Sequence, residues 1–120
     1  MPTSTPKLKN LLARRKEIEL TVVGRKSGRK SCRPVWFVLE GDTLYLLPVR
    51  GSDTGWYKNI LQNPKISISV GGVQGELEAS PVTDPKAVSS VVEKFRAKHG
   101  AADVKKYYSK LDVAAVVKIS

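Results

Sequence analysis

The chain has 120 residues, the length of one domain, with 41% hydrophobic and 27% charged residues. This ordinary composition argues against disorder, and no apolar run approaches the roughly 20 residues that span a bilayer. A single cysteine, Cys32, excludes an internal disulfide, and a single histidine, His99, argues against a histidine-based metal centre or catalytic triad. The chain also begins without the apolar run of a secretory signal, so we expect a cytoplasmic protein.

The net charge of +10 is concentrated near the N-terminus. Up to Arg33 the sequence contains ten lysines and arginines and two glutamates, a net charge of +8. Such a field attracts nucleic acid, anionic lipid or a phosphorylated small molecule, and it also fits a basic surface without a partner. Charge alone leaves these alternatives open.

Short strands dominate the predicted elements. From Glu17 apolar residues alternate with polar ones, which predicts a half-buried strand, and glycines at 24 and 28 then mark a turn. Similar patterns predict five further strands, at residues 31–39, 44–49, 66–70, 73–79 and 113–119. We expect residues 1–16 to form a basic arm or short helix before a domain at residues 17–120.

Helices are predicted between the later strands, at residues 56–61, at 85–99 and from 103 onward. Asp84 is expected to cap the second helix and Asp103 the third, while His99 falls at a helix C-terminus, where we expect a capping role. Strands joined by two-residue connections must pair antiparallel. Six twisted strands around one core therefore predict a mainly β (α+β) domain, a closed or partly open antiparallel barrel with short flanking helices.

The turn at residues 24–28 carries the first candidate binding residues, Arg25, Lys26 and Ser27. Flanking glycines let successive backbone N–H groups converge on an anion. The arginine can grip a phosphate from two sides, the lysine adds a point charge and the serine a hydroxyl donor. The same residue types also fit a solvated hairpin turn.

A second candidate stretch, Val49, Arg50, Gly51 and Ser52, precedes a short helix. A helix N-terminus offers free N–H groups to a phosphate or carboxylate. On that helix Trp56 and Tyr57 could pack against a planar ring and Asn59 could bond a ligand, although core packing explains each aromatic residue equally well.

Three further features bear on chemistry. Trp36 and Phe37 are consecutive in a strand, so one points inward and the other outward, as a ligand platform or subunit contact. Tyr107 and Tyr108 either cover a core or offer a hydroxyl to a substrate as hydrogen-bond or proton donor. Cys32 is expected to be a packed strand residue, since no base partner for a nucleophile is visible.

Read in order, these features resemble one family. The segment TVVGRKSGRKSCRPVWFVLEGDTLYLLPVRGSDTGWYKNILQNPKISISV is similar to the deazaflavin-dependent nitroreductases of the split-barrel flavin-binding superfamily. The resemblance implies a split barrel of the FMN-binding type that binds coenzyme F-420, an 8-hydroxy-5-deazaflavin. It also implies roles for individual residues: Arg25, Lys26 and Ser27 at the phosphodiester and acidic tail, Arg33 and Pro34 beside the ring or its side chain, Val49, Arg50, Gly51 and Ser52 at the ring edge, Trp56, Tyr57 and Asn59 closing the pocket, and Tyr107 and Tyr108 at the substrate.

Three functions remain in contention. The resemblance favours an oxidoreductase that transfers hydride from a reduced deazaflavin to a small planar acceptor such as a quinone, an enone or a nitroaromatic compound. The same barrel could instead hold FMN. A non-enzymatic barrel that binds nucleic acid through the basic first third ranks lower, because the basic residues gather at a turn and arm and do not interleave with aromatic residues. The resemblance also makes a homodimer plausible.

Overall fold

The computed structural model describes residues 11–12, 15, 17–24 and 28–119. The strands are β1 (Glu17–Val23), β2 (Lys30–Glu40), β3 (Thr43–Leu46), β4 (Lys65–Val70), β5 (Val73–Val82) and β6 (Ala114–Lys118). The helical segments are η1 (Gly51–Asp53), α2 (Gly55–Gln62), α3 (Pro85–His99) and α4 (Ala101–Tyr107). None of the helices described is both long and apolar enough to cross a membrane.

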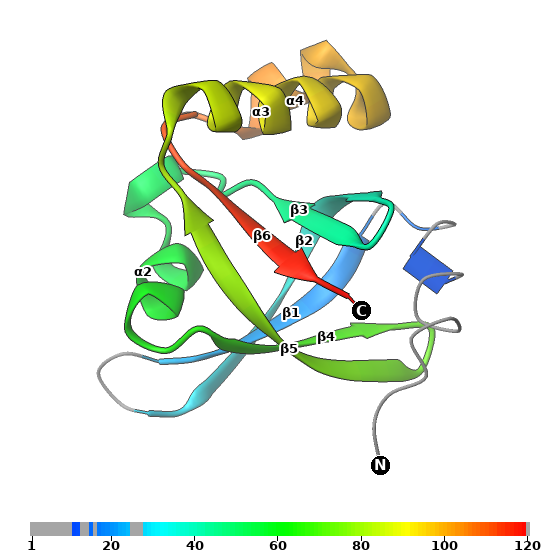
Figure 1. The fold of residues 1–120 in the computed structure, drawn as a ribbon, viewed down its shortest axis with the longest axis vertical. Coiled ribbons are helices and arrows are strands. Elements are labelled where there is room, and N and C mark those ends of the chain that lie inside the picture. Colours follow the sequence, from blue (N-terminus) through cyan, green and yellow to red (C-terminus); the bar gives the residue numbers. More distant parts are fainter. Residues whose placement is uncertain (1–10, 13–14, 16, 25–27, 120) are drawn as a thin grey trace.

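The strands form a closed barrel in the order β1-β2-β3-β6-β5-β4, with β4 pairing back onto β1 (Figure 1). Every strand pair is antiparallel. The predicted six-stranded antiparallel barrel is therefore confirmed. Closure gives each strand two neighbours, although β3 pairs only with residues 37–40 of the longer β2.

The barrel interior follows from the alternation of the strands. In β1 the side chains of Ile18, Leu20 and Val22 are buried while Glu17 and Glu19 are exposed. Apolar residues of the other strands fill the same interior, and Trp56, Tyr57 and Ile60 of α2 pack into it together with Leu12. Burying a side chain of this size contributes roughly 1.5–3 kcal/mol, so this cluster stabilises the barrel strongly.

A second apolar cluster lies outside the barrel, under α3 and α4, which pack side by side in Figure 1. Val91 and Phe95 of α3 and Val104 of α4 meet Val38 of β2 and Leu47 just after β3. The start of α3 is as predicted, because the Asp84 carboxylate accepts a hydrogen bond of 3.0 Å from the Ala87 N–H. The helical layer thus sits over one end of β2.

Three local predictions are wrong. The third strand ends at Leu46, because Pro48 has no N–H to continue the ladder. The last helix starts at Ala101 and not at Asp103, since Gly100, at φ +96°, turns the chain at once into the new helix. Cys32 is exposed and not packed, because it lies near the turn end of β2, away from the helical layer.

Candidate functional site

A pocket opens where β2 changes partners. Residues 30–36 pair with β1 and residues 37–40 with β3, and β3 ends at Leu46 opposite Phe37. Beyond this point β2 and the chain after β3 diverge and leave a pocket of about 240 Å³, which we call the split pocket. It is lined by four predicted site residues, Pro34, Val49, Tyr107 and Tyr108, and by Glu17, Val35, Trp36 and Leu47.

Trp36 supplies the central aromatic surface of the split pocket. As predicted, it and Phe37 point to opposite sides of β2: Phe37 is fully buried in the barrel, whereas Trp36 is half-buried outside it. The Trp36 ring stacks on His99 with centroids 4.4 Å apart and planes 12° apart. Tyr107 meets it edge-on at 5.5 Å and Tyr108 at 6.1 Å. Held from several sides, the indole is a preorganised wall for a planar ligand.

His99 contacts a neighbouring strand. It is the last residue of α3, where we expected a cap, but its Nε2 lies 3.1 Å from the Phe37 carbonyl oxygen. Lys98 Nζ donates to the same oxygen at 3.0 Å, and burial lowers the pKa of this lysine. The end of α3 thus supplies two hydrogen-bond donors to the carbonyl of Phe37. The helix is thereby fastened to β2 beside the split pocket.

The two tyrosines occupy different environments. Tyr107 is 49% exposed at the pocket, whereas Tyr108 is buried between Phe95 and Trp36. Burial raises the pKa of Tyr108 well above its usual range, so its hydroxyl stays protonated at any ordinary pH. Tyr108 is thus suited to donate a hydrogen bond and poorly suited to release a proton.

Behind Val49 the loop after β3 is tied to the segment after α4. The Ser109 N–H donates to the Val49 carbonyl at 2.9 Å, and Arg50 and Lys110 form a parallel bridge. One step further, the Asp112 carboxylate accepts hydrogen bonds from the Ser52 N–H at 3.0 Å and the Ser52 hydroxyl at 2.6 Å. The Ser52 bonds also lower the pKa of Asp112.

Gly51 lies under the same carboxylate. Its φ of +55° is one that residues with a Cβ rarely adopt, and a Cβ there would lie 2.0 Å from Asp112 Oδ1. Gly51 and Ser52 therefore face Asp112 and do not line the split pocket. Sequence reasoning missed Asp112, because it lies sixty residues from Ser52 and no local pattern marks it.

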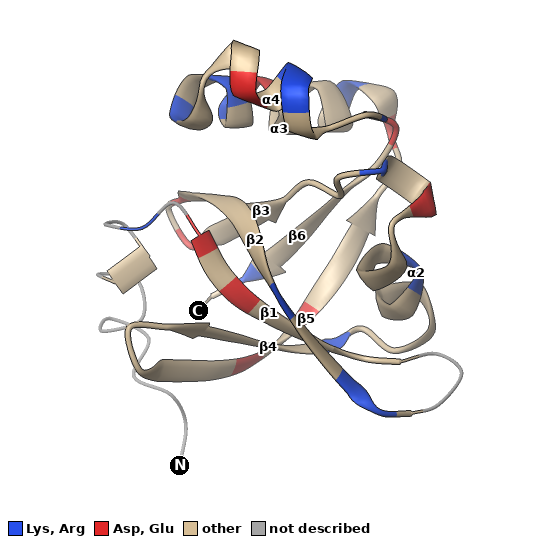
Figure 2. Ribbon diagram, turned by 180° about the vertical axis from the view of Figure 1, so that it is seen from behind, with Lys and Arg blue, Asp and Glu red and all other residues tan. Residues whose placement is uncertain are grey.

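The predicted phosphate turn lies at the far end of the β1–β2 hairpin. Gly28 has φ +71°, and its N–H donates to the Gly24 carbonyl at 2.9 Å. Arg25, Lys26 and Ser27 lie outside the described residues. Figure 2 shows basic segments on β2 and acidic ones on β1, and Arg33 is an exposed cation on β2, opposite Leu20.

The predicted residues of α2 do not reach the split pocket. Trp56 and Tyr57 are each 3% exposed and pack in the barrel core, 6.4 Å apart between ring centroids. Burial, together with the charge of Asp112, raises the pKa of Tyr57. Asn59 is half-buried on the same helix, and its carbonyl accepts the N–H of Asn63 at 2.9 Å. The helix α2 therefore packs its aromatic side chains into the barrel core.

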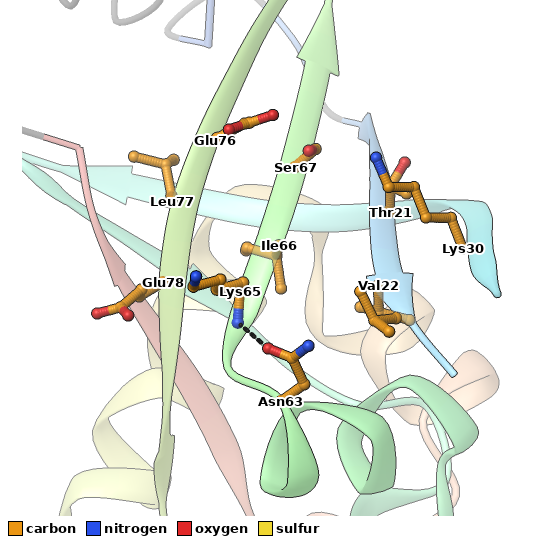
Figure 3. Close-up of a pocket in the computed structure, with 11 residues that line it drawn as sticks. Thr21, Val22, Lys30, Asn63, Lys65, Ile66, Ser67, Glu76, Leu77 and Glu78 are labelled. Carbon is orange, nitrogen blue, oxygen red and sulfur yellow. Dashed lines mark hydrogen bonds between the residues drawn. The ribbon is translucent and has the colours of Figure 1, made fainter. Parts of the chain in front are cut away.

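A second hollow, of about 410 Å³, lies at the opposite end of β1 (Figure 3). It combines apolar residues such as Val22 and Ile66 with both lysines and glutamates; the charged residues are Lys30, Lys65, Glu76 and Glu78. At its edge the Asn63 side chain accepts the Lys65 N–H at 3.1 Å. Mixed charge gives this hollow no preference for an anionic or a cationic ligand, so the split pocket is the better candidate.

Solved structures with similar folds are functionally varied. The chain is similar to a domain-swapped dimer (22% identity, TM-score 0.65, 87% of this chain and 81% of that one). It is similar to an F420-H2 dependent reductase, FDR-A (22% identity, TM-score 0.64, 87% and 95%). It is also similar to HutZ, the heme storage protein from Vibrio cholerae (17% identity, TM-score 0.71, 98% and 90%).

These likenesses establish the fold, a split barrel of the FMN-binding type, as the sequence resemblance implied. The fold is shared by one protein named as a reductase and by one named for heme storage, so it leaves the activity open. A family model matches nearly the whole chain, over residues 8–119. The chain belongs to the family described as "Uncharacterized protein conserved in bacteria (DUF2255)".

Proposed function

We propose that this protein is an oxidoreductase that binds coenzyme F-420 with the deazaflavin ring in the split pocket and passes hydride to a small planar acceptor, such as a quinone, an enone or a nitroaromatic compound. The observation that carries the proposal is the split pocket itself. It brings Pro34, Val49, Tyr107 and Tyr108 together from three distant parts of the chain. The sequence resemblance assigned each of them to the cofactor or the substrate.

The residues present fit a planar ring with an anionic tail. The split pocket has a volume of about 240 Å³ and is lined mainly by aromatic and aliphatic side chains, with Glu17 as the one charged residue among the described residues that line it. From Pro34 to Lys30 β2 runs for four residues, or ~13 Å, toward the turn at residues 24–28. Because β3 does not pair with this stretch, its free edge can accompany an extended ligand tail. Arg25, Lys26 and Ser27 would then hold the phosphate, and Arg33 is an additional cation along the way.

When bound, the reduced cofactor would supply the hydride. The protein would supply position. Trp36, fixed by its stack on His99, would orient the ring plane, and Val49, 45% exposed, would contact the ring from the loop side. Tyr108 offers a protonated hydroxyl that orients a ligand oxygen, while Tyr107, at the open side, covers the acceptor and can donate a proton to it. Alignment of the two reactants contributes much of the rate in such a transfer.

The imidazole geometry argues against haem as the ligand. Haem iron in proteins is commonly held by a histidine nitrogen. His99 is the only histidine of the chain, and it is buried, stacked on Trp36 and engaged with the Phe37 carbonyl through Nε2. Offering that nitrogen to iron would break one of the two contacts that join the end of α3 to the Phe37 carbonyl.

A binding titration tests the proposal. Oxidised coenzyme F-420, FMN and hemin are each titrated into the protein, and tryptophan fluorescence reports binding. We expect coenzyme F-420 to bind most tightly and the Arg25→Ala, Lys26→Ala double variant to bind it at least about tenfold more weakly, since two charge-assisted hydrogen bonds to phosphate are removed. Lys86→Ala with Lys118→Ala removes the same charge away from the split pocket and should leave the affinity unchanged. Equal losses of affinity in both double variants, or tighter binding of FMN, would refute the proposal as stated.

A further inference from the structure

We infer that Asp112 is a positioning residue for the split pocket: its carboxylate locks the loop that carries Val49 to the segment that carries Tyr107 and Tyr108. The relevance of this lock to catalysis rests on the proposed function, but its effect on the pocket walls does not.

The lock has a backbone part and a side-chain part. In the backbone, the Ser109 N–H binds the Val49 carbonyl at 2.9 Å, and the bridge between Arg50 and Lys110 continues the pairing. In the side chains, Asp112 receives both the N–H and the hydroxyl of Ser52. Two parallel hydrogen bonds to one carboxylate fix the relative position of the two segments in more than one direction, which a single bond would not do.

Lys110 extends the lock on its outer side. Its Nζ lies 3.3 Å from Asp53 Oδ2 and 3.7 Å from Asp112 Oδ2, so the ammonium bridges the two carboxylates. The loop is also braced internally, because the Arg50 N–H donates to Thr54 Oγ1 at 2.7 Å and the Gly51 N–H to the Pro48 carbonyl at 3.1 Å. A braced loop transmits the position of Ser52 to Val49, so a shift at Asp112 would move the pocket wall.

The location of the lock separates positioning from core stability. Asp112 is exposed and belongs to neither apolar cluster, and its side chain keeps 38% of its accessible surface. The barrel and the helical layer are held by their own buried residues. Val49 and Tyr107, by contrast, are about half-exposed, so few other contacts restrain the open side of the pocket.

The test compares Asp112→Ala with Asp103→Ala, which removes an equal charge from the exposed side of α4. The first measurement is the near-ultraviolet circular dichroism of Trp36 without ligand, assigned by subtracting the spectrum of Trp36→Phe. Because Tyr107 and Tyr108 lie 5.5 and 6.1 Å from this indole, we expect Asp112→Ala to change its signal and Asp103→Ala to leave it unchanged. The second measurement is the dissociation constant for oxidised coenzyme F-420, which should rise about tenfold in Asp112→Ala only.

A conservative variant shows whether the hydrogen bonds are responsible. Asn at 112 keeps an acceptor for the Ser52 N–H, so Asp112→Asn should bind within about threefold of the wild type. If Asp112→Ala keeps the Trp36 signal and the affinity while only the melting temperature falls, Asp112 is structural and the inference is wrong. If the wild-type protein does not bind coenzyme F-420, the proposed function fails, and the Trp36 signal of the ligand-free variants still decides the positioning role.

Discussion

Gly51→Ala measures the strength of the Asp112 lock, with Gly41→Ala as its matched control. Both glycines have a positive φ, +55° and +61°, so a new Cβ costs each of them about 1–2 kcal/mol of backbone strain. At Gly41 the Cβ meets open space, whereas at Gly51 it would lie 2.0 Å from Asp112 Oδ1. Only Gly51→Ala must therefore push the carboxylate away from Ser52.

The additional cost of Gly51→Ala comes from the two hydrogen bonds that break when the carboxylate moves. A hydrogen bond to a charged group contributes about 1.5–3 kcal/mol. Because Asp112 is exposed, we take the lower end of this range as the contribution of its two bonds to Ser52 together. We therefore expect Gly51→Ala to cost about 1–2 kcal/mol more than Gly41→Ala. For a chain of this length that corresponds to a melting temperature about 4–8 °C lower.

The assay is urea unfolding of both variants in the wild-type and Asp112→Ala backgrounds. Without the carboxylate, the excess cost of Gly51→Ala should shrink by at least half, and the remainder reflects the Lys110 carbonyl, 3.0 Å from the new Cβ. Equal costs for the two glycine variants, or an excess that is the same in both backgrounds, would contradict the claim that Asp112 is held over Gly51.

Three further predictions concern the split pocket and its supports. Val49→Asp should weaken coenzyme F-420 binding at least about tenfold and leave the melting temperature nearly unchanged. Leu61→Asp, at a similarly exposed site on α2, should change neither the affinity nor the melting temperature. A binding titration and a melting curve of each variant check these expectations. His99→Ala should lower the free energy of unfolding by about 2–4 kcal/mol, since it removes the stack on Trp36 and a buried hydrogen bond. Lys98→Met should lower it by less than about 1 kcal/mol, because His99 still donates to the Phe37 carbonyl. Urea unfolding of the two variants checks this order. Because the pKa of Tyr108 is raised, the folded state keeps the hydroxyl proton above pH 10.0, the ordinary pKa of the group, while the unfolded state loses it. The free energy of unfolding should therefore fall as pH rises past about 10, and it should fall by less in Tyr108→Phe. Unfolding measured between pH 8 and 11 gives the difference.

Local patterns were sufficient to predict most of the elements. In β1 and β4 every second residue is apolar and buried, and this alternation in the sequence is sufficient to predict both strands. The pairing of β3 with β6, by contrast, joins residues about seventy positions apart, and no local pattern in the sequence indicates it. Cys32 shows the limit of local reasoning, since its burial depends on which end of β2 the helices cover.

The candidate site was predictable in part for the same reason. Pro34, Val49, Tyr107 and Tyr108 were singled out as members of motifs, and the fold brings them to one pocket. Trp56 and Tyr57 carried an equally good motif, but their helix packs inward, and an aromatic residue on a short amphipathic helix looks the same in sequence whichever way it faces. The family resemblance places Ser52 at the cofactor, whereas in the fold its N–H and hydroxyl bind Asp112, a partner that no local sequence pattern indicates.

The position of the split pocket follows from the length of β2. This strand has 11 residues, whereas β3 has only four, so β2 must run on past the end of its neighbour. In a closed barrel that excess leaves a gap on one side of β2, and the chain after β3 has to leave the barrel wall there. Whatever covers the gap must come from elsewhere in the chain, and here it is the end of α4, attached through Ser109 and Asp112. The open side of the pocket can change shape without disturbing either apolar cluster, because Val49 and Tyr107 belong to neither of them, whereas Leu47 and Tyr108 are part of the second one.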